Sequence, residues 1–331
     1  LTVTLDDPTG YGRILRNPSG QVSAIVEQKD ASEAQRQIRE INTGIMAVQR
    51  ERLAGWLARI DNKNSQQEYY LTDIIALAVA EGIEIRTVNP LCEQEVMGIN
   101  DRQQLAYLER HYQRQQADRL MRSGVTLADP TRIDIRGNLQ VGTDIYIDFN
   151  TVFEGDVEIA DGVTIGPNVL IRDTKIHENA EILANCVIED AEIGAGCSIG
   201  PFARIRPDTV LAENVKVGNF VEVKKSQVSS GSKINHLSYV GDSQIGSQVN
   251  IGAGTITCNY DGANKYRTII GDRAFIGSDT QLVAPVTVGE GATIGAGSTI
   301  TRDAPPEQLT LSRSKQISIE GWERPVTKPK K

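Results

Sequence analysis

The residues best suited to acid–base chemistry in this sequence are its three histidines, His111, His177 and His236. An imidazole titrates near neutral pH, so it is the side chain best matched to accept a proton there. His111 lies in a helical stretch and His177 among acidic residues, and both are interpreted as surface residues. His236 lies close to Tyr239 and is the candidate base; a structural histidine held by other side chains is the alternative.

Two cations, Arg206 and Lys224, are eighteen residues apart, which is one full turn of the repeat described below. On adjacent strands their backbones would lie about 4.8 Å apart. Like charges at that distance repel by about 3 kcal/mol at an effective dielectric constant of 20. The spacing favours an anion site between the two cations. The alternative is that both extend into solvent or pair with Glu222 or Asp242.

A six-residue repeat from about residue 130 onward would position these side chains. Three short strands per coil, each pointing one apolar residue inward, bury a continuous column when coils stack. The period therefore predicts a mainly β fold, a three-sided parallel β-helix over residues 125–331, and it does not fit an α-helix or a sandwich. The apolar series begins at Ile135, Val141, Ile147, Phe153, Ile159, Ile165 and Ile171, continues with some five-residue steps to Ile251, and resumes from Ile270 to Ile300.

The residues before the repeat mix strand and helix patterns. Residues 1–100 are interpreted as part of an α/β domain and residues 101–124 as a helical linker that ends before Gly124. The chain does not begin with Met, and we expect a fragment or a processed chain. The expected strands are 22–26, 43–48 and 83–88, the expected helices are 49–59 and 71–80, and the expected linker stripe is Leu105, Leu108, Tyr112 and Met121.

Composition limits the partners and the compartment. The 43 acidic against 35 basic residues give a net charge of -8, which argues against nucleic acid and anionic membranes as partners. No stretch has eighteen consecutive apolar residues, and the first seven residues lack the basic and apolar regions of a signal peptide, so we expect a cytoplasmic protein. Four cysteines without a CxxC pair indicate reduced thiols. The polar insertion at 257–268 is expected to project as a loop.

Four long motifs lie within the repeat: Gly200-Pro-Phe-Ala-Arg-Ile-Arg-Pro207, Val217-Gly-Asn-Phe-Val-Glu-Val-Lys-Lys225, His236-Leu-Ser-Tyr-Val-Gly-Asp242 and Asn250-Ile-Gly-Ala-Gly-Thr-Ile-Thr-Cys-Asn-Tyr-Asp-Gly262. With these motifs, essentially the whole chain resembles the bacterial bifunctional N-acetylglucosamine-1-phosphate uridylyltransferase/glucosamine-1-phosphate N-acetyltransferase family. The resemblance implies a left-handed β-helix, an exception to the right-handed preference of parallel crossovers, and a homotrimer with sites at subunit interfaces. It implies N-acetylation of glucosamine-1-phosphate by acetyl-CoA, in the UDP-N-acetylglucosamine pathway that serves peptidoglycan and lipopolysaccharide.

The same resemblance implies a role for each matching residue of the repeat. His236 would be the general base, and backbone N–H groups beside Ala253 would stabilise the oxyanion. Lys265, in the insertion, would reach the sugar-phosphate site of a neighbouring subunit. The sugar phosphate would be held by Arg206, Lys224, Tyr239, Asn250 and Lys265, and acetyl-CoA by Ala253, Asn259, Tyr260, Ser278, Ala296 and Arg313.

The first hundred residues resemble the uridylyltransferase part of the family in shorter motifs. The family's opening Gly-rich nucleotide loop and the aspartate that shares Mg²⁺ with Asn100 have no counterpart here. We therefore expect no uridylyl transfer by this chain alone. Asn100 is also a candidate N-cap of the linker helix. The resemblance assigns UDP-sugar contacts to Gly12, Glu27, Asn42 and Asn100, and the Mg²⁺ ligand to Asn100.

Other classes of function fit the sequence less well. A non-catalytic β-helix scaffold would not need Arg206, Lys224 and His236 close together, and a nucleotidyltransferase as the main activity would need the Gly-rich loop. A zinc hydratase built on three histidines is disfavoured, because His177 and His236 are about three coils, or about 15 Å, apart along the axis. Ligands of one zinc ion each lie about 2 Å from it.

Overall fold

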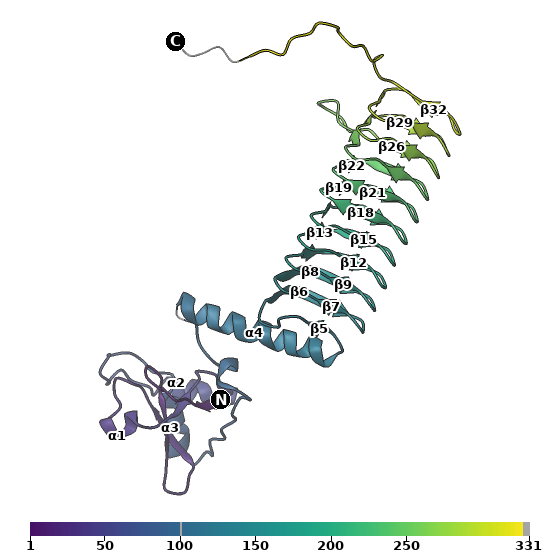
Figure 1. Ribbon diagram of the computed structural model, residues 1–331. Coiled ribbons are helices and arrows are strands. Elements are labelled where there is room, and N and C mark those ends of the chain that lie inside the picture. The colour runs from purple at the N-terminus through teal and green to yellow at the C-terminus, as the bar shows by residue number, and fades with distance from the viewer. Residues whose placement is uncertain (100, 327–331) are drawn as a thin grey trace, which may run out of the picture. The chain divides into compact units, whose positions relative to one another are not determined.

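The computed structural model describes residues 1–99 and 101–326, which divide into two compact units between His111 and Tyr112 (Figure 1). The first unit is built on an antiparallel four-stranded sheet in the order β1-β4-β2-β3. Helix α2 packs on α3, and Trp56, Ile74 and Ala78 form a small core there. Its elements are β1 (Thr2–Thr4), β2 (Arg13–Arg16), β3 (Val22–Val26), α1 (Glu33–Arg36), β4 (Glu40–Asn42), α2 (Arg50–Leu57), α3 (Asp73–Ala80) and the 3₁₀ helix η1 (Glu93–Glu95).

The strand expected at 22–26 and the helices expected at 49–59 and 71–80 are present, with shorter helix bounds. The strands expected at 43–48 and 83–88 are wrong, because both segments are irregular. Beside β1, segment 43–48 bonds to Leu1 alone, through Thr43 N and Ile45 O, and segment 83–88 bonds through Val88 O to Thr2 N. A β-strand needs a repeated series of hydrogen bonds to a neighbouring strand, which these segments lack. Their apolar residues were therefore not sufficient to predict strands.

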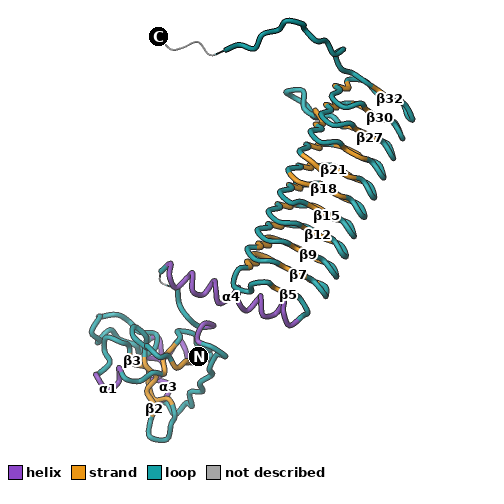
Figure 2. Tube along the Cα trace, in the orientation of Figure 1, coloured by secondary structure: helices purple, strands orange, loops and turns teal. Residues whose placement is uncertain are grey.

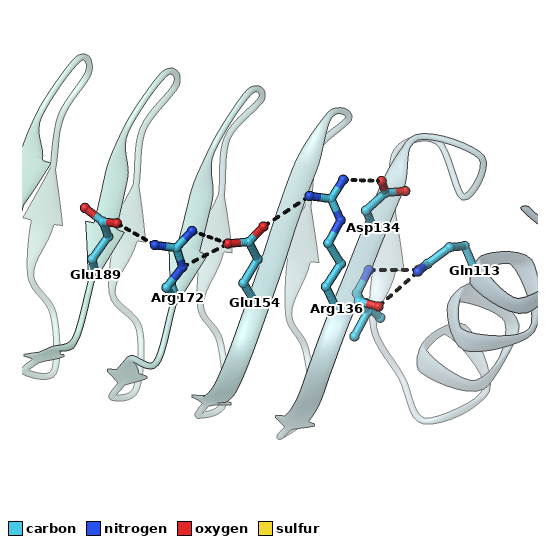
Figure 3. A network of polar contacts seen from close by, with 7 residues as sticks. Gln113, Asp134, Arg136, Glu154, Arg172 and Glu189 are labelled. Atoms are coloured by element: carbon cyan, nitrogen blue, oxygen red, sulfur yellow. Dashed lines mark hydrogen bonds and ion pairs between the residues drawn. The ribbon is translucent and has the colours of Figure 1, made fainter. Parts of the chain in front are cut away.

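Helix α4 (Arg102–Arg122) lies within the residues 101–124 that were expected to be helical. It ends in a Schellman motif, in which Gly124 has φ +100° and Val125 N donates to Leu120 O. The buried stripe differs from the expected one, because Leu105 and Tyr112 are about half exposed. Gln113 is buried instead, and its side-chain amide exchanges hydrogen bonds of 2.9 and 2.8 Å with the O and N of Ile135 (Figure 3). This amide closes the open edge of the β-helix at its first coil.

The second unit is the expected parallel β-helix, whose coils stack along one axis (Figure 2) and whose strands form three faces. The first face contains β5 (Thr126–Leu127), β7 (Tyr146–Ile147), β9 (Thr164–Ile165), β12 (Glu181–Ile182), β15 (Ser198–Ile199), β18 (Lys216–Asn219), β21 (Lys233–His236), β24 (Asn250–Ile251), β27 (Phe275–Ile276), β30 (Thr293–Ile294) and β32 (Leu309–Thr310). Two nine-residue strands, β6 (Ile133–Val141) and β8 (Thr151–Ile159), run from the second face into the third.

The remaining strands belong to the other two faces and pair in parallel between successive coils. The second face continues with β10 (Leu170–Arg172), β13 (Val187–Glu189), β16 (Arg204–Ile205), β19 (Glu222–Lys224), β22 (Tyr239–Gly241), β25 (Ile256–Cys258), β28 (Gln281–Val283) and β31 (Thr299–Ile300). The third face continues with β11 (Lys175–Ile176), β14 (Ala191–Ile193), β17 (Thr209–Leu211), β20 (Gln227–Val228), β23 (Ser243–Ile245), β26 (Thr268–Ile270) and β29 (Val286–Val288).

The predicted apolar series is the core of the β-helix. Every residue of that series is buried except Val141, which is half-buried in the first coil. Coils repeat every 17 or 18 residues, as the pairs Ile147 with Ile165 and Ile165 with Ile182 show. Each buried isoleucine contributes about 1.5–3 kcal/mol relative to an exposed one, so the stacked column stabilises coils that could not fold singly.

The expected loop is present between β25 and β26, where it leaves the coil and carries one antiparallel bridge, Tyr260 with Lys265. It is the green loop that projects beside the upper coils in Figure 1. Within residues 1–99 and 101–326, no helix has both the length and the apolar character needed to cross a bilayer.

One corner of the β-helix, between the first and second faces, changes character along the axis. Its early coils carry Asn150, Asn168 and Asn185, whose side-chain amides bond to one another at 2.9 and 3.2 Å. Asparagine tolerates the left-handed backbone that this corner requires. Three later coils place Phe202, Phe220 and Leu237 there with φ between 48° and 57°, and their side chains are 48%, 55% and 63% exposed. We call these three residues the apolar corner.

Candidate active site

His236 ends strand β21 on the first face, and its imidazole is held by a side chain of the preceding coil. Asn219, at the end of β18, is its partner in register, and His236 Nδ1 lies 2.9 Å from Asn219 Oδ1. An amide oxygen only accepts hydrogen bonds, so Nδ1 carries the proton. Nε2 of the neutral ring then carries the free lone pair, which is the arrangement that a general base needs.

His236 also stands in line with the residues predicted to contact acetyl-CoA. Extending the registers of β21, β24, β27 and β30 by two residues places Asn219, His236, Ala253, Ser278 and Ala296 at one position of successive coils. Backbone bonds confirm the stacking: Gly254 N donates to His236 O at 3.3 Å and Asp279 N to Ala253 O at 2.7 Å. We call this line of five residues the histidine column.

The outermost predicted acetyl-CoA residues take different positions. Ser312 extends the histidine column by the register of β30 with β32, and Arg313 follows it, with its Nη1 donating to Ala296 O at 2.8 Å. Asn259 lies at the base of the projecting loop and is buried. Tyr260 turns back on the loop, where its hydroxyl donates to Gly262 O at 2.5 Å, and its side chain is mostly exposed. Asn250 lies in β24, in register with Lys233 and Phe275.

Arg206 and Lys224 lie on neighbouring coils of the second face, as their spacing predicted. The pairs Arg204 with Glu222 and Ile205 with Val223 set this register, and Arg206 N bonds to Val223 O at 2.9 Å. One alternative interpretation also holds in part, because Arg206 Nη1 forms an ion pair of 2.6 Å with Glu222. That carboxylate raises the pKa of Arg206 and leaves Lys224 as the less compensated cation.

Lys265, from the projecting loop, adds a third cation beside Lys224 of its own chain. Contact with Lys265, followed by desolvation and the charge of Arg206, lowers the pKa of Lys224, and Asp242 acts in the opposite direction. The same contact, followed by the charge of Asp242, raises the pKa of Lys265. The three cations Arg206, Lys224 and Lys265, here called the cation cluster, therefore form a site that an anion would stabilise.

Glu222, Gly241 and Asp242 were not predicted as functional residues. Asp242 accepts a hydrogen bond of 2.5 Å from Asn259 Nδ2 and acts electrostatically on Lys224 and Lys265. Asn219 was also missed. Asn219 precedes His236 by 17 residues, which is the length of one coil. Counting back one coil from the candidate base would therefore have found it.

The cation cluster follows a column of alternating charges on the second face. Arg136, Glu154, Arg172 and Glu189 occupy one outward position on successive coils (Figure 3). Arg136 Nη1 lies 3.1 Å from Glu154, Arg172 Nε 2.9 Å from Glu154, and Arg172 Nη1 3.0 Å from Glu189. Continuing the registers by one residue places Arg206, Lys224 and Gly241 next. These seven residues are called the charge column below.

The other histidine of the β-helix is separate from these columns. His177 Nε2 lies 2.8 Å from Glu192 Oε1, near the third face, and its side chain is 30% exposed. Its side chain lies at the surface but is partly covered and paired, so it is less exposed than expected. The reason is that Glu192, in β14, lies on the adjacent coil. His111 lies in α4 within the first unit.

Three of the predicted UDP-sugar residues lie together in the first unit. Asn42 N donates to Gly12 O at 2.8 Å, and Glu27 accepts a hydrogen bond of 2.9 Å from Thr72. A Cβ added to Gly12 would lie 3.2 Å from a carboxylate oxygen of Glu27. The antiparallel pairing of β2 with β3 and β4 brings them together. Asn100 lies outside the described residues.

Comparison with known proteins gives two family matches and many similar sequences. Residues 135–228 match the GMPPB C-terminal domain and residues 267–302 match the bacterial transferase hexapeptide (six repeats). Among solved structures, a UDP-N-acetylglucosamine acyltransferase from Campylobacter jejuni matches 55% of this chain and 71% of its own, with 19% identity and a TM-score of 0.32.

Two curated relatives match nearly the whole chain. The bifunctional protein GlmU of Nitrosospira multiformis is 60% identical over 331 residues, which are 100% of this chain and 72% of that protein. GlmU of Methylococcus capsulatus is 61% identical over 98% of this chain and 71% of its own length. Identity of this level over this coverage shows that the chain belongs to the family of bifunctional GlmU proteins.

Proposed function

We propose that the β-helix transfers the acetyl group of acetyl-CoA to the amino group of glucosamine-1-phosphate. Membership of the GlmU family and the hexapeptide repeats support acetyl transfer in the UDP-N-acetylglucosamine pathway. The observation that carries the proposal is the imidazole of His236. Its Nδ1 is held by Asn219 and its Nε2 is left free, in line with Ala253 and Ser278. In the pathway, the product would serve peptidoglycan and lipopolysaccharide synthesis.

The proposed reaction needs one base and one oxyanion site. Nε2 of His236 removes a proton from the attacking amine of the neutral substrate as the nitrogen lone pair adds to the thioester carbonyl. Backbone N–H groups beside Ala253 stabilise the oxyanion of the tetrahedral intermediate. The intermediate collapses to the amide as the C–S bond breaks, and the imidazolium returns its proton to the coenzyme A thiolate. A positioned base of this kind contributes about 10²–10⁴ in rate.

The cation cluster is proposed to hold the phosphate of the sugar. A phosphate monoester brings close to two negative charges and three acceptor oxygens, as a phosphorylated side chain does. Arg206, Lys224 and Lys265 can donate to those oxygens, while Tyr239 and Asn250 position the sugar ring. The meeting of three cationic side chains supports this assignment, because a bound dianion would compensate their mutual repulsion.

Acetyl-CoA is proposed as the acyl donor, bound along the histidine column and its extension. Ala253 and Ser278 have small side chains there, which leaves the corner open to a long ligand. Arg313 adds a positive charge at the far end, where coenzyme phosphates would be bound. The proposed contacts are Ala253, Asn259, Tyr260, Ser278, Ala296 and Arg313.

We also propose a homotrimer in the cytoplasm. The apolar corner supports an assembly, because Phe202, Phe220 and Leu237 adopt a backbone conformation that costs roughly 1–2 kcal/mol for such residues and yet expose their side chains. The rings of Phe202 and Phe220 stack 5.3 Å apart and present one continuous surface. A second copy of the chain would cover it. All four cysteines are free thiols, which fits a reducing compartment.

The first unit is proposed to keep part of a UDP-sugar site at Gly12, Glu27 and Asn42. Their proximity supports that assignment. The Mg²⁺ ion is assigned to Asn100, which lies outside the described residues, and no step of the proposed acetyl transfer uses that ion.

A thiol-release assay with acetyl-CoA and glucosamine-1-phosphate tests the proposed function. Wild type should release thiol only when the sugar phosphate is present, and His236→Ala should lower kcat by about 10²–10⁴. The matched control is His177→Ala, which removes a paired histidine of the same β-helix and should leave kcat unchanged. Unchanged thiol release in His236→Ala would overturn the mechanism, and no release by wild type would overturn the function.

A further inference from the structure

Gly241 lies where the two predicted substrate sites meet. It ends strand β22 and is in register with Lys224 of the cation cluster. A Cβ built on Gly241 would lie 2.4 Å from the hydroxyl oxygen of Tyr239 and 2.8 Å from Nδ2 of Asn259. Tyr239 is assigned to the sugar phosphate and Asn259 to acetyl-CoA. Both polar groups therefore lie over the same point of the backbone, in the space that a side chain would fill.

The backbone of Gly241 does not itself require glycine. Its φ lies outside the left-handed region, so an L-residue can adopt the conformation. The nearest atoms to the added Cβ all belong to the ends of side chains. This differs from Gly218 and Gly252, on the first face, where the added Cβ would lie 2.0 Å and 2.6 Å from backbone atoms of the next coil. Stability of the coil therefore explains glycine at 218 and 252 but not at 241.

The partners of Asn259 and Lys224 link the two substrate sites. Asn259 Nδ2 donates to Asp242 at 2.5 Å, and Asp242 acts electrostatically on Lys224 and Lys265. Displacing the amide of Asn259 would break this bond and move the group assigned to acetyl-CoA. Displacing the hydroxyl of Tyr239 would move the group assigned to the sugar phosphate. A single methyl group at position 241 would do both.

We propose that Gly241 is a positioning residue that lets the Tyr239 hydroxyl and the Asn259 amide converge, and so sets the distance between the sugar phosphate and acetyl-CoA. This inference rests on the proposed function. It deepens that function by assigning the alignment of the two substrates to a residue without a side chain. A residue with this role affects both substrates, whereas each of its two neighbours affects one.

Steady-state kinetics of Gly241→Ala, with each substrate varied in turn, test the proposal. We expect KM to rise about tenfold for glucosamine-1-phosphate and about tenfold for acetyl-CoA, as expected for losing one good hydrogen bond to each. Tyr239→Phe should raise KM for the sugar phosphate alone, and Asn259→Ala should raise KM for acetyl-CoA alone. The pair Gly241→Ala/Tyr239→Phe should show the same sugar-phosphate KM as Tyr239→Phe, because both changes remove one interaction.

Each outcome of this experiment has a distinct meaning. Wild-type KM values for both substrates in Gly241→Ala, with unchanged thermal unfolding, would overturn the proposal. A lower melting temperature with wild-type KM values would show a purely structural glycine and would also overturn it. Absence of thiol release by the wild type would overturn the proposed function itself and is recognised before any variant is measured.

Discussion

The two ends of the charge column use the same backbone position for different purposes. On the early coils, Arg136, Glu154, Arg172 and Glu189 alternate in sign, and each cation contacts a carboxylate of its own column. On the later coils, Arg206 is followed by another cation, Lys224, and then by Gly241. The early region neutralises itself, while the later region keeps an excess of positive charge.

The difference shows how a repeat protein builds a binding site without changing its fold. Both regions have the same parallel register and the same buried isoleucines and valines beneath the column. Alternating charges on adjacent strands stabilise the sheet modestly, whereas like charges destabilise it. In the charge column, Lys224 stands where the alternation would place an acidic residue. This one residue therefore replaces a stabilising ion pair with a site that an anion would stabilise. Outward positions of the solenoid vary because the core does not depend on them.

Lys224→Glu extends the alternation into the site and should have the largest effect. The new carboxylate would pair with Arg206 and repel the phosphate, so kcat/KM for glucosamine-1-phosphate should fall about 10³-fold. Thermal unfolding should be unchanged or occur at slightly higher temperature. Lys225→Glu, at the adjacent exposed corner residue, is the charge-matched control and should cost far less. A kcat/KM within tenfold of wild type for Lys224→Glu would show that Lys224 does not bind the phosphate of the substrate.

Glu154→Lys is the mirror change, because it copies the break into the early region. Three cations would then stack at Arg136, residue 154 and Arg172, and the free energy of unfolding should fall by about 1–2 kcal/mol. Urea unfolding of the variant and of wild type measures the difference. Catalysis should be unaffected, since the histidine and acetyl-CoA residues lie on other coils. Equal free energies of unfolding for Glu154→Lys and wild type in low salt would show that the ion pairs of the early charge column do not stabilise the protein.

The pH dependence of stability should show the smallest effect. Hydrogen bonds from Arg172, together with the charges of Arg172 and Arg136, lower the pKa of Glu154 below its ordinary value. A carboxyl group with a lowered folded-state pKa stabilises the protein above its unfolded pKa of about 4.3, and this contribution is lost as pH falls through the folded pKa.

Melting temperatures of wild type and Glu154→Gln, measured from pH 6 down to pH 3, test this sign. The melting temperature of wild type should exceed that of Glu154→Gln by a constant amount near pH 6, and this difference should shrink as pH falls. If the difference in melting temperature grows toward low pH, the ion pairs of Glu154 with Arg136 and Arg172 do not stabilise the folded protein.

Several features were predictable because they depend on local periodicity. The hexapeptide series located the β-helix and its buried residues, with Val141 as the half-buried exception. Counting eighteen residues placed Arg206 beside Lys224, and the rarity of histidine singled out His236. The irregular segments 43–48 and 83–88 were predicted as strands, because an apolar run does not reveal whether a neighbouring strand is available to pair with it.

The partners of the site residues were decided by the tertiary structure. The sequence left open what holds His236, and the structure assigns that contact to the side chain of Asn219. It also placed Lys265 beside Lys224 of the same chain, because the path of an inserted loop is independent of the repeat.

The sequence by itself determined the coil, its core and the order of outward side chains, because each hexapeptide repeats one local rule. Only the tertiary structure decided which outward side chains meet across corners and from the loop: Asn219 with His236, Asp242 with Asn259, and Tyr239 over Gly241. The physical reason is that register changes between 17 and 18 residues and shifts by 25 at the insertion. Which side chains meet therefore depends on the lengths of all the coils between them along the chain.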